Sequence, residues 1–73
     1  MSNAERRNGE RVWEAVNAIF QTGEMLMTVG EVAIAARMSR GAAKKYLDML
    51  IASNHVKKFA KGERTAYYTL WSA

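Results

Sequence analysis

The sequence predicts a small α+β fold in which three helices are followed by a β-hairpin that completes a small antiparallel sheet. Two observations predict it. Apolar residues recur at helical spacing in three segments between residues 9 and 53. After residue 54 the apolar period changes to two, and a polar turn with a glycine, KGER at 61–64, divides that region into two strands. In a chain of 73 residues, we therefore expect one domain over 9–73.

The first helix is expected over residues 9–22, with a flexible N-terminus at 1–8 before it. Asn8 can cap its start, and Gly23 suits the position after its end. The Ser-Asn-Ala near the start looks like a remnant of tag removal, so residues 1–4 carry no functional argument. The apolar residues expected to cover the core are Val12, Trp13, Val16, Ile19 and Phe20.

A short extended segment and a capped helix come next. EMLMT at 24–28 is apolar and too short to be stable alone, so we expect it to pair with a later strand. Thr28 and Glu31 match the S/T-x-x-E capping box, in which each side chain accepts a hydrogen bond from the other residue's backbone N–H. The box predicts a second helix over 29–36.

The third helix is expected over 40–53, with Ser39 as its N-cap. Because only Arg37 and Met38 separate it from the second helix, the two helices must turn sharply against each other, as in a helix-turn-helix. Its expected core residues are Ala43, Leu47 and Leu50, with Tyr46 and Ile51 on the flank.

The hairpin strands are expected at 55–60 and 65–71, with 24–28 as the available third strand. Alternation along the second strand places Tyr68 and Leu70 together on the inner face. The residues expected on the other face are Tyr67, Thr69 and Trp71. Aromatic hairpin residues are more often core than stacking platforms, and single-strand binding would need exposed Tyr67 and Trp71 rings.

Two overlapping stretches, TVGEVAIAARMSRGAAKKYLDMLIASNHVKK and NHVKKFAKGERTAYYTL, resemble the winged helix-turn-helix family of bacterial transcription regulators. The shared features are a threonine-started helix, an alanine at its pivot, a Ser-Arg start to the next helix, and a Tyr-x-Leu end at Tyr68 and Leu70. The resemblance implies a recognition helix at about 40–53 in the DNA major groove. It also implies a wing at 57–68 on the adjacent backbone or in the minor groove.

One position departs from the family pattern. Arg37 stands in the turn where the family usually has glycine, which suits a backbone with positive φ. An arginine there costs about 1 kcal/mol or more. Either this turn differs slightly, or Arg37 is kept for another reason such as a phosphate contact.

The charge is distributed unevenly along the chain. Residues 37–64 hold eight basic and two acidic residues, a net charge of +6, whereas the rest holds three basic and five acidic residues, a net −2. A basic half of this kind favours a polyanionic partner, although clustered charges are also common on ordinary solvated faces.

The candidate DNA-binding residues on the recognition helix are Ser39, Arg40, Gly41, Lys44 and Lys45, and those on the wing are Lys57, Lys58, Lys61 and Arg64. Arg40, on the first turn, could contact guanine bidentately. Gly41 either lets the backbone approach the groove floor or packs against the second helix. Lys44 and Lys45 could contact bases or phosphates, and a point charge on a flexible stem suits phosphates better. Arg64 suits the minor groove and Lys61 a phosphate, although lysines also protect hairpin edges from aggregation.

Other functional classes find little support in the sequence. There is no cysteine and a single histidine, His55, so we expect no metal site and no cofactor. No Gly-rich phosphate loop or paired carboxylates indicate an enzyme. No apolar run approaches the roughly 20 residues of a membrane span.

These observations together predict a sequence-specific double-stranded DNA-binding protein, a transcriptional regulator of the cytoplasm associated with the nucleoid. We expect no membrane association and no small-molecule effector. Trp13 and Trp71 are candidate contacts of a homodimer. The alternative is a protein–protein interaction module within a larger regulatory or nucleoprotein complex, because a fold does not fix its function.

Overall fold

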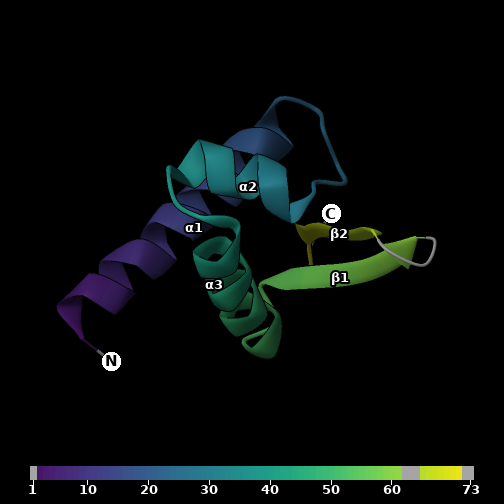
Figure 1. The fold of residues 1–73 in the computed structure, drawn as a ribbon. Helices are drawn as coiled ribbons and strands as arrows, with labels where there is room; N and C mark the ends of the chain where they lie inside the picture. Colours follow the sequence, from purple (N-terminus) through teal and green to yellow (C-terminus); the bar gives the residue numbers. More distant parts are fainter. Residues whose placement is uncertain (1, 62–64, 72–73) are drawn as a thin grey trace.

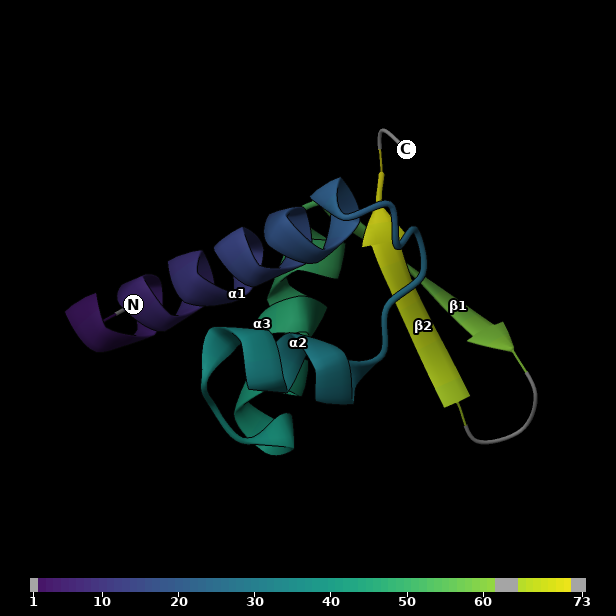
Figure 2. The same ribbon diagram turned by 90° about the horizontal axis from the view of Figure 1, so that it is seen from above.

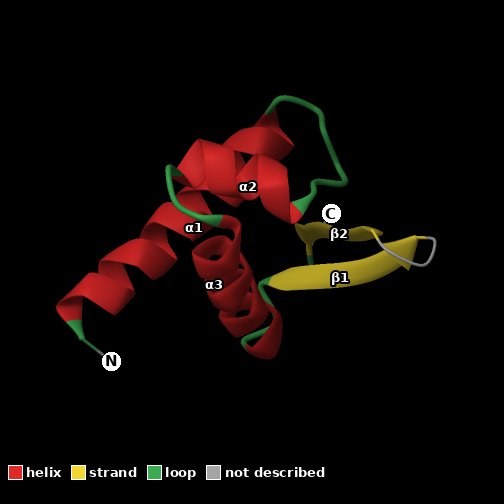
Figure 3. Ribbon diagram, in the orientation of Figure 1, coloured by secondary structure: helices red, strands yellow, loops and turns green. Residues whose placement is uncertain are grey.

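The computed structural model describes residues 2–61 and 65–71, and it has the expected α+β fold of three helices followed by a two-stranded antiparallel hairpin (Figure 1). The elements in chain order are α1 (Asn3–Gln21), α2 (Val29–Ala36), α3 (Arg40–Ala52), β1 (Val56–Lys61) and β2 (Thr65–Leu70). The helices pack together on one side, and the strands lead away from them on the other (Figure 3). This arrangement leaves the start of α3 beside the hairpin.

The predicted start of the first helix at residue 9 is wrong. α1 begins at Asn3, and its N-cap is Ser2, whose hydroxyl accepts a hydrogen bond from the Glu5 N–H at 3.1 Å. Residues 3–8, expected to be flexible, form the first turns of the helix, so Asn8 is an interior residue. Those turns are polar and largely exposed, and they carry no apolar period from which a helix can be predicted.

The second and third helices follow their predicted caps. The Thr28–Glu31 capping box is present, with Glu31 N–H to Thr28 Oγ1 at 3.2 Å and Thr28 N–H to Glu31 Oε1 at 3.0 Å. Ser39 caps α3 by accepting from the Ala42 N–H at 3.1 Å. α2 has the predicted bounds, and α3 ends one residue before the predicted position 53.

The hydrophobic core lies where the three helices meet the inner face of the hairpin. Large side chains from every helix and strand fill this core, and alanines occupy the positions where the helices approach closely. The buried apolar residues are Val12, Ala15, Val16, Met27, Val32, Ala33, Ala36, Ala43, Tyr46, Leu47, Val56 and Tyr68. Tyr46, expected on the flank of α3, is among them.

The hairpin pairs Val56 with Leu70 and Lys58 with Tyr68, so these residues share its inner face. The third strand expected at 24–28 is reduced to one bridge, in which Met27 and Tyr68 exchange hydrogen bonds of 2.9 and 2.8 Å. The segment between α1 and α2 runs alongside β2 (Figure 2). A single bridge is enough to bury Met27 completely and to tie this segment to the hairpin.

Candidate nucleic-acid interface

The turn between α2 and α3 orients the helix that the sequence singled out for DNA recognition. Arg37 has φ 58° and ψ 53°, the left-handed conformation that usually favours glycine. The Met38 N–H donates to the Ala33 carbonyl at 3.0 Å, and the Arg37 N–H to the Ile34 carbonyl at 3.2 Å. These two bonds form the Schellman motif, so the turn keeps the geometry expected of a glycine although an arginine occupies it.

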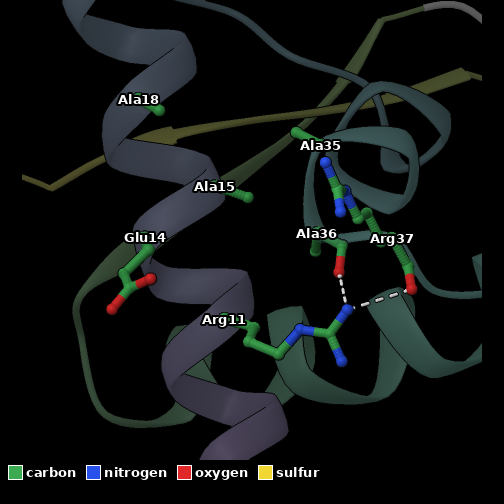
Figure 4. Close-up of a pocket in the computed structure, with 7 residues that line it drawn as sticks. All are labelled: Arg11, Glu14, Ala15, Ala18, Ala35, Ala36 and Arg37. Carbon is green, nitrogen blue, oxygen red and sulfur yellow. Dashed lines mark hydrogen bonds between the residues drawn. The ribbon is translucent and has the colours of Figure 1, made fainter.

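An arginine from α1 supports this turn. Nη2 of Arg11 donates hydrogen bonds to the carbonyl oxygens of Ala36 and Arg37, the second at 3.1 Å (Figure 4). The last carbonyl groups of a helix have no partner within the helix, and a cation is favourable at that end. Arg11 therefore has a structural role at the turn. It lies in a hollow of about 280 Å³ between α1 and α2, which is lined by Arg11, Glu14, Ala15, Ala18, Ala35, Ala36 and Arg37.

The predicted residues on α3 are all exposed: Ser39, Arg40, Gly41, Lys44 and Lys45. Ser39 uses its hydroxyl to cap the helix. A Cβ placed on Gly41 would meet no atom within 4 Å, so the alternative that Gly41 packs against the second helix is wrong. The open space at Gly41 is consistent with the other interpretation, a close approach by a partner.

The cationic residues of α3 and the hairpin do not form one continuous patch. Arg40, Lys44 and Lys58 meet in a groove of about 440 Å³, between the N-terminal ends of α2 and α3 and the inner face of the hairpin. We call it the basic groove. It is lined by Thr28, Val29, Gly30, Arg40, Lys44, Lys58, Ala66 and Tyr68.

Arg40 lies over the first turn of α2. A Cβ built on Gly30 would lie 3.3 Å from its Nη2 atom and 3.4 Å from its Nε atom. The absence of a side chain at Gly30 therefore makes room for the guanidinium. In this position the arginine belongs to the basic groove, together with the backbone of α2.

Two lysines of α3 have acidic partners. Lys44 Nζ lies 3.1 Å from Asp48 Oδ2, one helical turn further on, and this carboxylate raises the pKa of Lys44. Lys45 Nζ lies 3.5 Å from Glu5 Oε2 of α1, and Lys45 lowers the pKa of that carboxyl. All four side chains are well exposed, so neither pair contributes much stability. Lys45 thus faces α1 and does not line the basic groove.

Lys57 and Lys58, neighbours in β1, lie on opposite faces of the hairpin. Lys58 lines the basic groove, whereas the Nζ atom of Lys57 lies 4.6 Å from the ring centroid of Trp71, a cation–π contact. The description of the structure does not extend to the side chain of Lys61, and Arg64 lies outside the described residues. The predicted contacts of both remain predictions.

The aromatic residues expected on the outer face of the hairpin differ in exposure. Trp71 is 49% exposed, and Tyr67 is half-buried. Both rings reach solvent, so their exposure is consistent with the alternative of single-strand binding. Trp13, the other homodimer candidate, packs against the core, and its ring centroid lies 5.2 Å from that of His55.

The sequence did not single out Thr28, Gly30 and Tyr68 as parts of the site. Thr28 was predicted as a cap and Tyr68 as a core residue, and both predictions are confirmed. Their position at the groove depends on how α2 and the hairpin pack against α3, for which the sequence gives no local signal.

Two kinds of feature are absent from residues 2–61 and 65–71. No group of three or more His, Cys, Asp or Glu side chains is placed to hold a metal ion there. In the same residues, no helix is both long and apolar enough to cross a membrane.

Comparison with models of protein families and with curated proteins found no match. A search of solved structures found similarity to the Zalpha domain of PKZ from Carassius auratus, whose crystal structure is a complex with Z-DNA. The TM-score is 0.69 at 18% sequence identity, over 93% of this chain and 98% of that one. The chain therefore has a winged-helix fold, in which α2 and α3 form the helix-turn-helix and β1 and β2 the wing.

Proposed function

We propose that this winged-helix domain binds double-stranded DNA and acts as a sequence-specific regulator of bacterial transcription, in the cytoplasm and on the nucleoid. The observation that carries the proposal is the basic groove, where Arg40, Lys44 and Lys58 lie together between the recognition helix and the wing. Three cations in one concave site favour a polyanion. The similarity of fold to a domain solved in complex with Z-DNA supports DNA as that polyanion.

In the proposed complex, α3 enters a DNA groove and the wing lies on the neighbouring backbone, as in the docking of helix-turn-helix proteins. α3 presents its exposed face over Arg40–Lys45, and the hairpin lies beside it. The space around Gly41 leaves the first turn of α3 open to a partner. Because the similar domain was solved with left-handed DNA, both duplex forms belong in the test.

The test is a fluorescence anisotropy titration of the domain with duplex DNA at several salt concentrations. With roughly five phosphate contacts, the slope of log affinity against log salt should be about −4 to −5. Circular dichroism of a CG-repeat duplex on titration would report any conversion to the left-handed form. Absence of duplex binding at low salt, for both mixed-sequence and CG-repeat DNA, would exclude the proposed function.

One observation favours the second candidate, a protein–protein interaction module. Ile34 of α2 is 82% exposed and lines a shallow pocket together with Ala18, Ile19 and Ala35. The other residues that line this pocket are Thr22, Glu24 and Glu31. A pull-down partner retained at high salt, together with a flat DNA titration, would favour this candidate. Loss of that partner in Ile34→Ser, with the fold intact, would locate the contact.

A further inference from the structure

The N-terminal end of α2 forms one wall of the basic groove. Val29 and Gly30 are the first two residues of this helix, and both line the groove. The first N–H groups of a helix have no carbonyl partner within it, and within the described residues these two donate no backbone hydrogen bond. The helix dipole adds a partial positive charge at the same end, so this wall favours an anion.

A second, independent feature is the buried tyrosine at the groove. Tyr68 is only 2% exposed, yet it lines the groove. Among the described residues its hydroxyl forms no hydrogen bond, although its backbone pairs with Met27. The hydroxyl of Tyr68 is not among the buried side-chain atoms that lack a partner, so it is the accessible end of an otherwise buried ring that lines the groove. The packing of the ring fixes this donor in place at the groove. Burial raises the pKa of Tyr68 above its ordinary value of 10, and the phenol is protonated and able to donate at neutral pH.

The charged groups of the groove agree with an anionic partner. Arg40, Lys44 and Lys58 contribute three positive charges to the lining, and no carboxylate is part of it. Two carboxylates that contact lining residues are already engaged, because Asp48 binds Lys44 and Glu31 accepts from the Thr28 backbone. The Arg40 guanidinium sits against Gly30, beside the unpaired N–H groups of α2.

We infer that the basic groove binds one phosphate group of the DNA backbone, with Tyr68 and the N–H groups of Val29 and Gly30 as neutral donors and the three cations around it. The inference rests on the proposed function and refines it. It gives Arg40 the role of positioning the DNA backbone, in place of the guanine contact expected from the sequence. Phosphate contacts fix the register of a protein on DNA but carry no sequence information directly.

The first test is Tyr68→Phe, which removes a hydrogen-bond donor and no charge. We expect duplex affinity to fall about tenfold, because a hydrogen bond to a charged group is lost. The salt slope should stay unchanged, since no cation is removed. A thermal melt of the variant controls for the fold. If Tyr68→Phe retains the fold and binds duplex as tightly as the parent, the inference is overturned.

The second test locates the phosphate. Duplexes with a single uncharged methylphosphonate linkage, moved one position at a time, should reveal one linkage whose neutralisation weakens binding. At that linkage Tyr68→Phe should have no further effect, because the tyrosine and the phosphate belong to the same contact. Full additivity of the two changes at every linkage would contradict the assignment.

Gly30→Ala tests the wall formed by α2. Its new Cβ would lie 3.3 Å from the guanidinium of Arg40 and push it away by a few tenths of an ångström, so we expect a small but measurable fall in duplex affinity. Gly9→Ala is the matched control, because it adds a methyl group to α1 at an ordinary 3.7 Å from Tyr46. Equal duplex affinities of Gly30→Ala and Gly9→Ala would contradict a role of the α2 N-terminus in the site.

A titration with inorganic phosphate separates this inference from the proposed function. We expect millimolar phosphate, added at constant ionic strength, to shift the amide NMR signals of Val29 and Gly30 in the parent, and to shift them less in Tyr68→Phe. If the domain binds no duplex but these shifts occur, the groove is a phosphate site and the DNA-binding proposal fails. If duplex binds and these amides do not respond to phosphate or to DNA, the groove assignment fails alone.

Discussion

Five cations of this domain fall into two groups that differ in what their charged ends contact, and a sixth is intermediate. Arg40 and Lys58 line the basic groove and form no salt bridge within the described part of the chain. The cations of the second group are committed to the protein itself: Arg11 to two backbone carbonyls, Lys45 to Glu5 and Lys57 to the ring of Trp71. Lys44 is intermediate, because it lines the groove while bound to Asp48.

This difference shows that the number of basic residues in the sequence is larger than the number of cations available to contact DNA. A cation that already has a partner must give it up to bind a phosphate, so it gains less from DNA. The groove cations gain the full interaction. Among these cations, we therefore expect Arg40 and Lys58 to contribute most to DNA affinity, and Arg11 to contribute most to the stability of the fold.

The largest expected effect is on the groove cations. The double variant Arg40→Ala/Lys58→Ala should lower duplex affinity about a hundredfold at low salt, at about tenfold for each lost charged contact. The salt slope should become shallower by about two. The loss should be similar for all duplex sequences, since both side chains are assigned to the backbone. If the variant loses affinity only for a preferred sequence, Arg40 contacts bases and the assignment to the DNA backbone is wrong.

Arg11→Ala should produce the next largest effect, on stability. Its two acceptors, the carbonyl groups of Ala36 and Arg37, would lose their charged donor, which should lower the free energy of unfolding by about 1–3 kcal/mol. Urea denaturation measures this change. Arg11→Lys is the control, because a lysine keeps the charge without the planar guanidinium. Native stability of Arg11→Ala would contradict the structural role of Arg11.

A smaller effect of opposite sign is expected at the turn. Arg37→Gly should raise the free energy of unfolding, because it removes a left-handed penalty of about 1 kcal/mol that the greater entropy of glycine in the unfolded chain partly offsets. Arg37→Ala keeps the left-handed strain and should show no gain. Thermal melts of the two variants compare them directly. A similar gain for both would trace the effect to the lost arginine side chain.

The smallest effect is expected at Lys45. Lys45→Ala should change duplex affinity less than about twofold and should change the free energy of unfolding very little, because its exposed pair with Glu5 is weak. The pKa of Glu5, which Lys45 lowers, should rise toward its ordinary value. A carboxyl with a lowered pKa stabilises the fold above its unfolded pKa and loses that contribution as pH falls, so the variant should be slightly less sensitive to acid. Carboxyl NMR titration measures the pKa directly.

Local signals predicted most of the fold. The Thr28–Glu31 capping box fixed the start of α2, and Ser39 fixed that of α3. Caps are readable because their hydrogen bonds join residues within three positions of each other. The start of α1 could not be predicted from apolar periodicity, because its first turns are polar and carry no such period.

The candidate site was less predictable, and its residues show why. Lys44 and Lys45 are neighbours in the sequence, but a step of one residue along a helix rotates the side chain by about 100°. One lysine therefore reaches the groove and the other reaches Glu5. Lys57 and Lys58 separate in the same way, since successive side chains of a strand point to opposite faces. The direction of each side chain on its own helix or strand can be predicted from the sequence, but the residue that it contacts on another element cannot.

The sequence by itself determined the helix-turn-helix, the hairpin and a basic half, because short-range hydrogen bonds and apolar periodicity specify these features locally. Only the tertiary structure decided which cations share a groove, that Arg11 supports the turn at Arg37, and that Tyr68 lies both in the core and at the groove. These features join residues far apart in the chain. They depend on the packing of α1, α2 and the wing around α3, which no local stretch of sequence encodes.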